Sequence, residues 1–255
     1  MDKMLIFIFL AYGLIIGSFL NAAIYRLHER KTLGGRSFCP HCKKQLRAVD
    51  LIPVLSFLFL GGKCRSCKKT ISLQYPLVEL STGLIFTAVF LKAGLTLETL
   101  FWLYFVSVSI FIFAYDLKFM IIPNKVVYPA LIIAGTYVVH RYAGGEAFIL
   151  WSIGAAFVLG LFFFILSVIA DGALMGGGDV KLVFLMGLIL PIGQFLLSLF
   201  LAFNIAALLS IFILIKKKTL KVRIPFGPFL ISGMLIAYFS GPPIIDTFFS
   251  SLILF

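Results

Sequence analysis

Two carboxylates at the ends of apolar segments could together carry out acid–base chemistry. Asp116 closes one apolar run in "FAYDLKFMIIPN", and Asp179 follows Gly176, Gly177 and Gly178 in "MGGGDVKL". Ionisable side chains at membrane spans cost free energy and usually mark function. Two carboxylates that face one another share a proton, so one can activate a water molecule while the other protonates a substrate carbonyl, as in aspartic proteases. The glycines can adopt positive φ and would let a substrate backbone approach Asp179 closely.

The same residues also allow simpler interpretations. Asp179 could serve only as the N-cap of a helix, and Asp116 could be an interfacial anion paired with Lys118. A proton relay in a transporter would use the same carboxylates. The residue types alone therefore leave both an aspartic protease and a proton-coupled transporter open.

Four cysteines form two Cys-x-x-Cys pairs in the only sizeable polar segment, residues 27–75. The pairs are "CPHC" and "CRSC", which contain Cys39, Cys42, Cys64 and Cys67. Pairs at this spacing can close a tetrahedral thiolate site, and four thiolates suit zinc. Disulfides or redox thiols are the alternative, but disulfides rarely persist in the cytosol, where this segment is expected to lie. A site with four sulfur ligands has no open position, so we expect a structural zinc that holds a small domain together.

Long apolar segments must position these residues. The chain has 255 residues, of which 62% are hydrophobic, and runs of about 20 apolar residues recur along it. Backbone groups in lipid must be hydrogen-bonded within their own segment, so these runs should be helices. The break between the sixth and seventh runs rests on "PIGQ" at 191–194. The sequence predicts an all-α polytopic membrane protein with about eight transmembrane helices, namely 4–26, 76–93, 98–116, 125–141, 147–169, 179–193, 195–215 and 228–250.

The first run is interpreted as a helix, although its weak basic start and small-residue end resemble a signal peptide. Cleavage there would export the basic segment that follows. The net charge of +12 then follows from topology and needs no nucleic acid. With eight spans and the N-terminus outside, every basic residue except Lys3, Lys92 and Arg141 faces the cytoplasm, as the positive-inside rule describes. Asp116 and Asp179 then lie at the same, cytoplasmic face.

Several motifs follow one another between Gly17 and Leu182. They are "GSFLNAAIYR" at 17–26, the two cysteine pairs with "LIPVLSFLFLGGK" at 51–63 between them, "QYPLVELSTG", "YDLKFMIIPN" and "MGGGDVKL". In this order they resemble the type IV prepilin peptidases, a family of GxGD-type intramembrane aspartic proteases. Gly176, Gly178 and Asp179 fill the GxGD pattern, and Asp116 matches the first aspartate of the family.

The resemblance implies an activity, a location and partners. Such enzymes remove the short basic leader of prepilins or pseudopilins at the cytoplasmic face of the bacterial plasma membrane, after a glycine and just before the hydrophobic helix. Many members also methylate the new N-terminus with S-adenosylmethionine, an activity associated with the cysteine domain. Glu79, in "YPLVELSTG", would contact the leader or belong to that second site. Asn124 stands in "IPN" where members often carry "IPD", which loses a charge but keeps the turn chemistry.

Together these observations predict three parts, which are a first transmembrane helix (1–26), a cytoplasmic four-cysteine domain (27–75) and a transmembrane aspartic protease domain (76–255). The expected partners are prepilins or pseudopilins of a pilus, secretion or competence system and the lipid bilayer, with no nucleic acid. A transporter would call for matched halves, and no such repeat is found. A third hypothesis is an assembly factor that docks through the zinc domain and does not need its aspartates.

Overall fold

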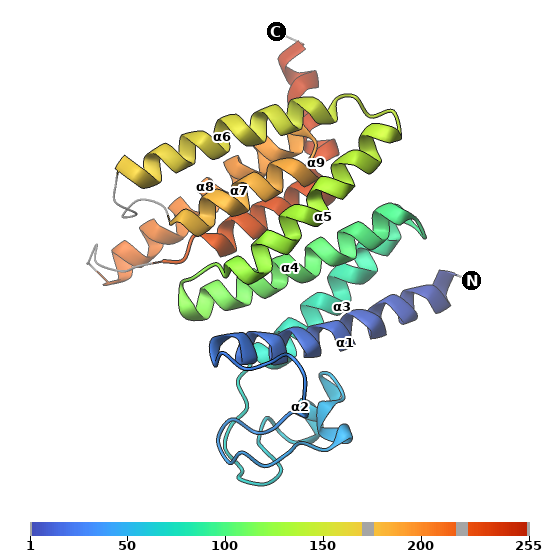
Figure 1. Cartoon of the computed structure of the whole chain (residues 1–255), viewed down its shortest axis with the longest axis vertical. Helices are drawn as coiled ribbons and strands as arrows, with labels where there is room; N and C mark the ends of the chain where they lie inside the picture. Colours follow the sequence, from blue (N-terminus) through green and yellow to red (C-terminus); the bar gives the residue numbers. More distant parts are fainter. Residues whose placement is uncertain (1, 170–175, 218–223, 254–255) are drawn as a thin grey trace. The chain divides into compact units, whose positions relative to one another are not determined.

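The computed structural model describes residues 2–169, 176–217 and 224–253. Within these ranges the regular structure is helical, apart from two isolated β-bridges in the insertion that follows the first helix, and turns and irregular segments connect the helices. Figure 1 traces the helices in chain order from α1 to α9. The chain divides into two compact units, Met1–Ala114 and Tyr115–Phe255, so that α4 begins in the first unit and ends in the second. Of the expected basic cluster at 216–223, residues 218–223 lie outside the described ranges.

Six of the described helices are long and apolar enough to cross a membrane, which confirms a multi-pass membrane protein. They are α1 (Asp2–His28), α3 (Gln74–Ala93), α4 (Leu97–Phe119), α6 (Ile149–Ile169), α8 (Ile192–Lys217) and α9 (Gly227–Ile253). The expected break near Pro191 is confirmed, because α7 ends at Ile189 and α8 begins at Ile192.

Two of the eight expected spans form helices that are not by themselves typical of a membrane span. Helix α5 (Asn124–Ala143) has Lys125 in its first turn and His140 and Arg141 in its last. Helix α7 (Gly177–Ile189) has 13 residues and is therefore only about 20 Å long, less than the hydrocarbon thickness of about 30 Å. Its side chains are instead largely buried by protein, as Val183 and Met186 show.

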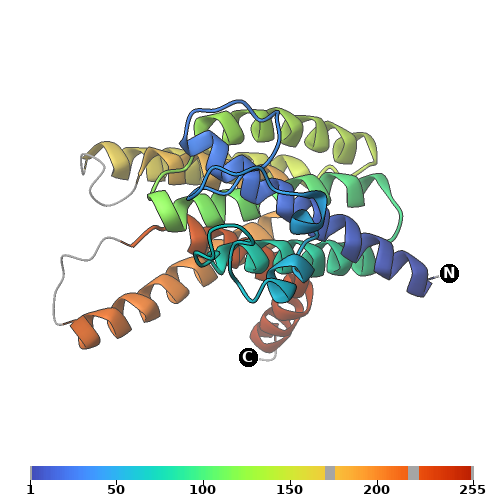
Figure 2. The ribbon, with the colours of Figure 1, turned by 90° about the horizontal axis from the view of Figure 1, so that it is seen from below.

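In the first unit, α1 and α3 pack closely because glycines lie where they cross. A Cβ at Gly13 would lie 2.7 Å from the Cα of Gly83, and a Cβ at Gly17 would lie 2.6 Å from the Cα of Glu79. Small residues let membrane helices approach until their backbones touch. The two helices accordingly lie against one another in both views (Figures 1 and 2).

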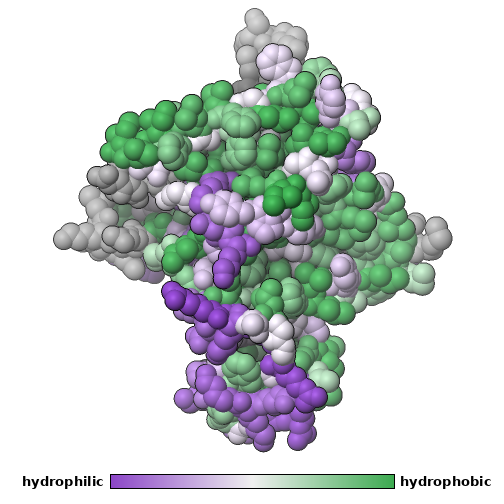
Figure 3. All heavy atoms as spheres, viewed as in Figure 1, coloured by the Kyte–Doolittle hydropathy of each residue, from purple (hydrophilic) through white to green (hydrophobic). Residues whose placement is uncertain are grey.

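The insertion between α1 and α3 has almost no core of its own. It contains a 3-10 turn at Ala48–Leu51 and the short helix α2 (Leu55–Phe59). Among residues 29–73, only Cys39 and Cys64 are buried. Hydrophilic side chains gather over the insertion, whereas the helices of this unit are largely hydrophobic (Figure 3).

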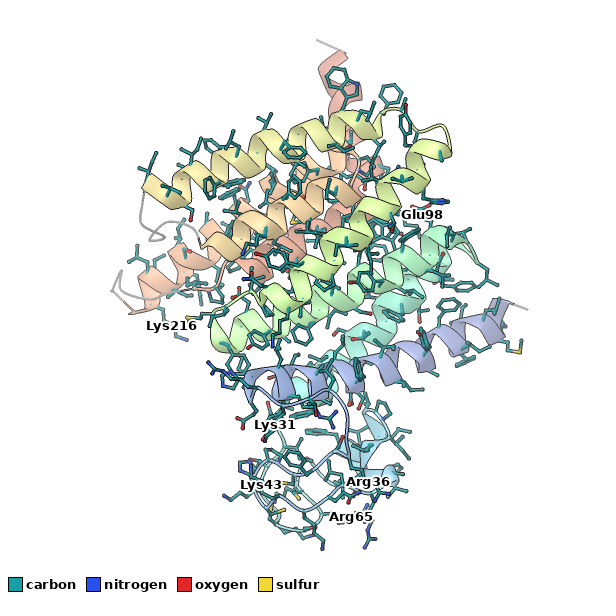
Figure 4. All side chains as sticks on the ribbon, viewed as in Figure 1. Lys31, Arg36, Lys43, Arg65, Glu98 and Lys216 are labelled. Atoms are coloured by element: carbon teal, nitrogen blue, oxygen red, sulfur yellow. The ribbon has the colours of Figure 1, made fainter. Side chains whose placement is uncertain are left out.

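Charged side chains lie at both ends of the first unit. Lys31, Arg36, Lys43 and Arg65 all lie on the insertion, and Glu98 lies at the other end of the unit, where α4 begins (Figure 4). Most basic side chains of this unit therefore lie on the insertion, and the side of the membrane that they face stays a prediction.

In the second unit, α7 is the central element. It packs along α6 and α5 and also contacts α8 and α9, while α8 and α9 lie side by side. Gly187 of α7 allows the approach to α6, since a Cβ there would lie 2.5 Å from the Cβ of Ala156. The N-terminal end of this buried helix is where Asp179 lies.

Candidate active site and metal centre

Asp116 lies in the last turn of α4 and is buried, with 4% of its surface exposed. Its Oδ2 accepts a hydrogen bond from the backbone amide of Gly227 at 3.1 Å. Gly227 is the first residue of α9, so the carboxylate faces the amide end of a helix, where anions are stabilised. The expected alternative, an ion pair with Lys118, is not formed between these described residues; Lys118 Nζ lies 5.3 Å from the ring centroid of Phe119.

Asp179 lies at the N-terminal end of α7, but it is not the N-cap that the simpler interpretation suggested. The helix begins at Gly177 with Gly176 as N-cap, which makes Asp179 the third helical residue. The amide of Asp179 donates to the carbonyl of Gly176 at 3.0 Å, and the amide of Gly176 donates to Asp179 Oδ2 at 3.2 Å. A carboxylate at this position reaches back to the N-cap amide, which explains why a glycine can occupy the cap.

Ile122, a buried residue between α4 and α5, lies next to both Gly178, which precedes Asp179, and Gly227, which binds Asp116. A Cβ at Gly178 would lie 2.8 Å from the Cβ of Ile122, and a Cβ at Gly227 would lie 3.3 Å from its Cδ1. Asp116 is bonded to Gly227 and Asp179 follows Gly178, so each aspartate adjoins a glycine that lies against Ile122. The fold thus brings the C-terminal end of α4 and the N-terminal ends of α7 and α9 together around one isoleucine.

The glycines at 176–178 let other groups approach the backbone closely, and they do not adopt unusual backbone angles. Gly176 has φ −73°, and Gly177 and Gly178 are helical, so the expectation of positive φ at these positions is wrong. Gly178 instead fits against Ile122, whereas nothing lies within 4 Å of a Cβ at Gly177. Both Gly176 and Gly177 are exposed. The run therefore leaves an open approach to the backbone just before Asp179.

Sequence reasoning missed Lys181, Ile122 and Gly227. Lys181 Nζ donates to Asn124 Oδ1 at 2.8 Å and lies 5.2 Å from the ring centroid of Tyr128, so it links the start of α7 to the start of α5. The signs of their importance in the sequence were only weak. Lys181 resembles an ordinary charge beside a membrane span, and Gly227 is a glycine between prolines in "IPFGPF".

Glu79 lies in the first unit, in α3, and is buried. Its Oε2 accepts a hydrogen bond from the amide of Val54 in the insertion at 2.7 Å, and the hydroxyl of Ser18 in α1 donates to the same carboxylate. Two further side chains tie this region together. The amide of Asn21 donates to the carbonyl of Tyr75 at 3.0 Å, and Arg26 donates to the carbonyls of Leu33 and Gly35. Glu79 is thus an anchor between the helices and the insertion.

The four cysteines come together as the spacing predicted. Their Sγ atoms all lie within 4.8 Å of one another, and Cys39 Sγ and Cys67 Sγ are 3.9 Å apart. Tetrahedral zinc with Zn–S bonds of about 2.3 Å would place its sulfurs about 3.8 Å apart, so the donor set fits that ion. None of the cysteines forms a disulfide. The cluster could therefore hold a metal ion.

The two halves of the metal site repeat one local structure. In each, the amide of the first cysteine donates to the carbonyl oxygen of the residue five positions on, with Cys39 N to Lys44 O at 2.9 Å and Cys64 N to Lys69 O at 2.8 Å. Lys43 and Lys68 follow the second cysteines with φ of 59° and 60°. The amides of Cys67 and Ser66 lower the pKa of the Cys64 thiol to about 7, which favours the thiolate that a metal needs.

Two protein-family models match most of the chain. Residues 11–93 match the bacterial peptidase A24 N-terminal domain, and residues 103–211 match the type IV leader peptidase family. The two matches lie largely on either side of the boundary between the compact units. No solved structure matches the chain significantly.

Curated relatives agree with these matches over nearly their full lengths. The chain is 34% identical to the prepilin leader peptidase/N-methyltransferase of Bacillus subtilis, over 92% of this chain and 94% of the relative. It is 32% identical to the protein of that name from Vibrio cholerae (94% and 98%) and 31% to the one from Legionella pneumophila (92% and 91%). The chain therefore belongs to the type IV leader peptidase family.

Proposed function

We propose that this protein is an intramembrane aspartic endopeptidase that removes the leader peptide of type IV prepilins or pseudopilins. The observation that carries the proposal is the pair Asp116 and Asp179, held beside Ile122 at the ends of buried helices. Family membership supports the same activity, because the relatives are named prepilin leader peptidases. It gives no support to a proton-coupled transporter.

In the proposed mechanism the two carboxylates share one proton. The ionised member takes a proton from a bound water molecule, and the water oxygen attacks the scissile carbonyl. The protonated member gives its proton to the carbonyl oxygen, which relieves the developing negative charge. The aspartate that took the proton from water then gives it to the nitrogen, the other aspartate takes a proton from a hydroxyl of the gem-diol, and the C–N bond breaks to release an amine and a carboxylic acid. The amide of Gly227 would keep Asp116 oriented throughout.

The substrate must be locally unwound, because a helical peptide bond is shielded from attack. The exposed residues Gly176 and Gly177, with Gly178 behind them, would receive the extended backbone beside Asp179. A leader peptide that ends at the start of a transmembrane helix offers such a segment at the membrane surface.

Orientation and domain organisation form part of the proposal. The basic insertion and the two aspartates would both face the cytoplasm. The proposed parts of the chain are a first helix (1–26), a four-cysteine domain (27–75) and a protease domain (76–255). In inside-out vesicles treated with a strong chelator trypsin should cut the insertion, and in spheroplasts treated in the same way it should not.

Glu79 is the proposed contact for the leader peptide. The carboxylate of Glu79 has lone pairs beyond those used by Val54 and Ser18, and these could accept a basic residue of the leader. The relatives' names include N-methyltransferase, so S-adenosylmethionine is the proposed methyl donor. Glu79 anchors the insertion in the described structure, so no methyl-transfer step is assigned to its carboxylate.

The proposed metal is zinc, bound by Cys39, Cys42, Cys64 and Cys67. Four sulfur ligands leave no position for a substrate, so its contribution is to hold the insertion in shape. The metal would take no part in peptide cleavage.

The decisive experiment is prepilin cleavage in membranes, read as a mobility shift, for the parent, Asp116→Asn and Asp179→Asn. Asparagine keeps the volume and removes the proton chemistry, so both variants should be inert while still inserted. Glu146→Gln is the matched control, since Glu146 is an exposed carboxylate paired with Arg141. Cleavage at the parent rate by either aspartate variant would exclude the pair as the catalytic groups, and absence of cleavage by the parent would favour an assembly factor.

A further inference from the structure

We infer that residues 49–59 of the insertion form an interfacial anchor that lies in the lipid bilayer surface beside α3. Most of the insertion exposes polar side chains, but this segment exposes a continuous apolar set. Leu58 is 65% exposed and Phe59 87%. Exposed apolar patches of this kind mark contact with another molecule or with a membrane. The exposed apolar members are Val49, Leu51, Ile52, Leu55, Leu58 and Phe59.

The depth of the segment is set by the hydrogen bond between Val54 and Glu79. The amide of Val54 lies 2.7 Å from Glu79 Oε2. Glu79 is the sixth residue of α3, so it lies about 7.5 Å along the helix from Gln74. At this level α3 itself exposes Leu77 and Leu80, with 62% and 42% of their surfaces accessible. The segment is thus held at the height where the lipid-facing surface of α3 has already begun.

The backbone shows that this attachment is specific. Val54 has φ 60°, a value that a β-branched residue rarely adopts. Such a conformation persists only where surrounding contacts hold it, and the bond to Glu79 is one of them. Val54 is also the N-cap of α2, so the attachment sets where the helix carrying Leu58 and Phe59 begins.

The segment also meets the demand that lipid places on the backbone. Around α2 the amides donate to carbonyls of the same segment, with Ser56 N to Ile52 O at 3.0 Å, Leu58 N to Val54 O at 3.1 Å and Gly62 N to Phe57 O at 2.9 Å. Backbone groups that are satisfied internally can enter an apolar medium at little cost.

Charge at the edges of the segment favours a bilayer as the occupant. The exposed residues Arg47 and Lys63 flank the apolar stretch on both sides. Basic residues next to an apolar, aromatic stretch are the pattern of an interfacial membrane segment, because they meet anionic head groups while the apolar side chains enter the acyl boundary. In Figure 3 the hydrophobic surface continues from the helices onto the side of the insertion where Figure 1 shows α2.

The test is photo-crosslinking in vesicles that contain phosphatidylglycerol, and it needs neither a substrate nor the proposed protease activity. The photoreactive residue p-benzoylphenylalanine replaces Phe59 in one protein and Lys44 in a matched control. Lys44 is exposed, and it adjoins Lys43 on the insertion (Figure 4). Lipid adducts on tryptic peptides are measured by mass spectrometry. We expect roughly tenfold more lipid adduct at position 59, since an apolar side chain partitions into the acyl region and a solvated one does not.

The remaining outcomes overturn the inference. Equal lipid labelling at positions 59 and 44 would mean that the segment does not enter the bilayer. Adducts at position 59 with a second copy of the chain, or only with an added prepilin, would assign the patch to a protein partner. Each labelled protein must keep its metal content, and a label at Leu58 replaces the one at Phe59 if that variant does not fold.

Discussion

The carboxylate of Asp116 is bonded to the backbone amide of Gly227, which lies 111 residues further along the chain. Only proline would remove this backbone donor, and it lies at the positive end of a helix, so it orients the carboxylate and favours its ionised form. The residue at 227 must also leave room for the oxygen it holds. This makes Gly227 a sensitive point of the site although it has no side chain.

Gly227→Ala should therefore damage activity more than stability. Its Cβ would lie 2.6 Å from Asp116 Oδ2, so the carboxylate must turn away or α9 must shift. Overpacking of this kind costs about 1–3 kcal/mol of unfolding free energy. A displacement of about 1 Å in a catalytic group can lower the rate roughly 100-fold. Cleavage rates and melting temperatures of the purified variant measure both effects.

The control for that variant is Gly135→Ala in α5, where no atom lies within 4 Å of the new Cβ. Alanine there should stabilise the helix by up to about 1 kcal/mol and leave cleavage unchanged. If Gly227→Ala also cleaved at the parent rate, the position of Asp116 would not depend on that contact.

Gly178→Ala and Gly177→Ala should differ although the residues are neighbours. A Cβ at Gly178 would meet the Cβ of Ile122 at 2.8 Å, and both atoms are fixed to the backbone. Separating α7 from the loop should cost about 1–3 kcal/mol and lower cleavage strongly. A methyl group at Gly177 enters open space, so that variant should be as stable as the parent, and a loss of cleavage there would report on the approach of the proposed substrate backbone. Equal losses of stability in the two variants would contradict Ile122 as the cause.

The sequence predicted the helices and the metal cluster well, because both depend on local patterns. Apolar runs locate helices in lipid, and the spacing of Cys39, Cys42, Cys64 and Cys67 closes a tetrahedral site. The helix boundary at Asp179 was predicted two residues late, because glycines were taken as a loop signal although Gly177 and Gly178 begin α7. The role of the aspartates stays a prediction.

Contacts between distant segments could not be predicted from one sequence. The bond from Gly227 to Asp116 and the fit of Gly178 against Ile122 depend on how helices pack, and no local pattern encodes them. The same holds for Glu79. Its place in an apolar run suggested function, but nothing local showed that it would accept a hydrogen bond from Val54.

Asn124→Asp should be nearly neutral. Asn124 Oδ1 accepts from Lys181 Nζ at 2.8 Å on an exposed surface, so the change turns a neutral acceptor into a surface ion pair. Such pairs contribute about 0–1 kcal/mol, and salt weakens them. Melting temperatures at low and high salt, with Lys181→Met as the second arm of a double-mutant cycle, measure the pair. A loss of cleavage in Asn124→Asp would show that an added negative charge here disturbs the nearby aspartates.

Metal removal should unfold the insertion and leave the second unit helical. Among residues 29–73 only Cys39 and Cys64 are buried, so no apolar core can hold this segment once the metal is gone. Binding of a structural metal then supplies most of its folding free energy, about 10–16 kcal/mol for zinc in small domains. A strong chelator should make the basic insertion sensitive to trypsin, and added zinc should restore protection.

Lys68→Gly and Cys42→Ser separate metal binding from local backbone strain. Glycine relieves the φ of 60° at position 68, so that variant should keep its metal and resist trypsin at least as well as the parent. Serine at position 42 removes one of four ligands, so the insertion should bind metal weakly and be cut without any chelator. Elemental analysis of both proteins identifies the ion and its stoichiometry. Full protection of metal-free Cys42→Ser would show that contacts such as Phe38 on Tyr25, with ring centroids 5.9 Å apart, hold the insertion by themselves.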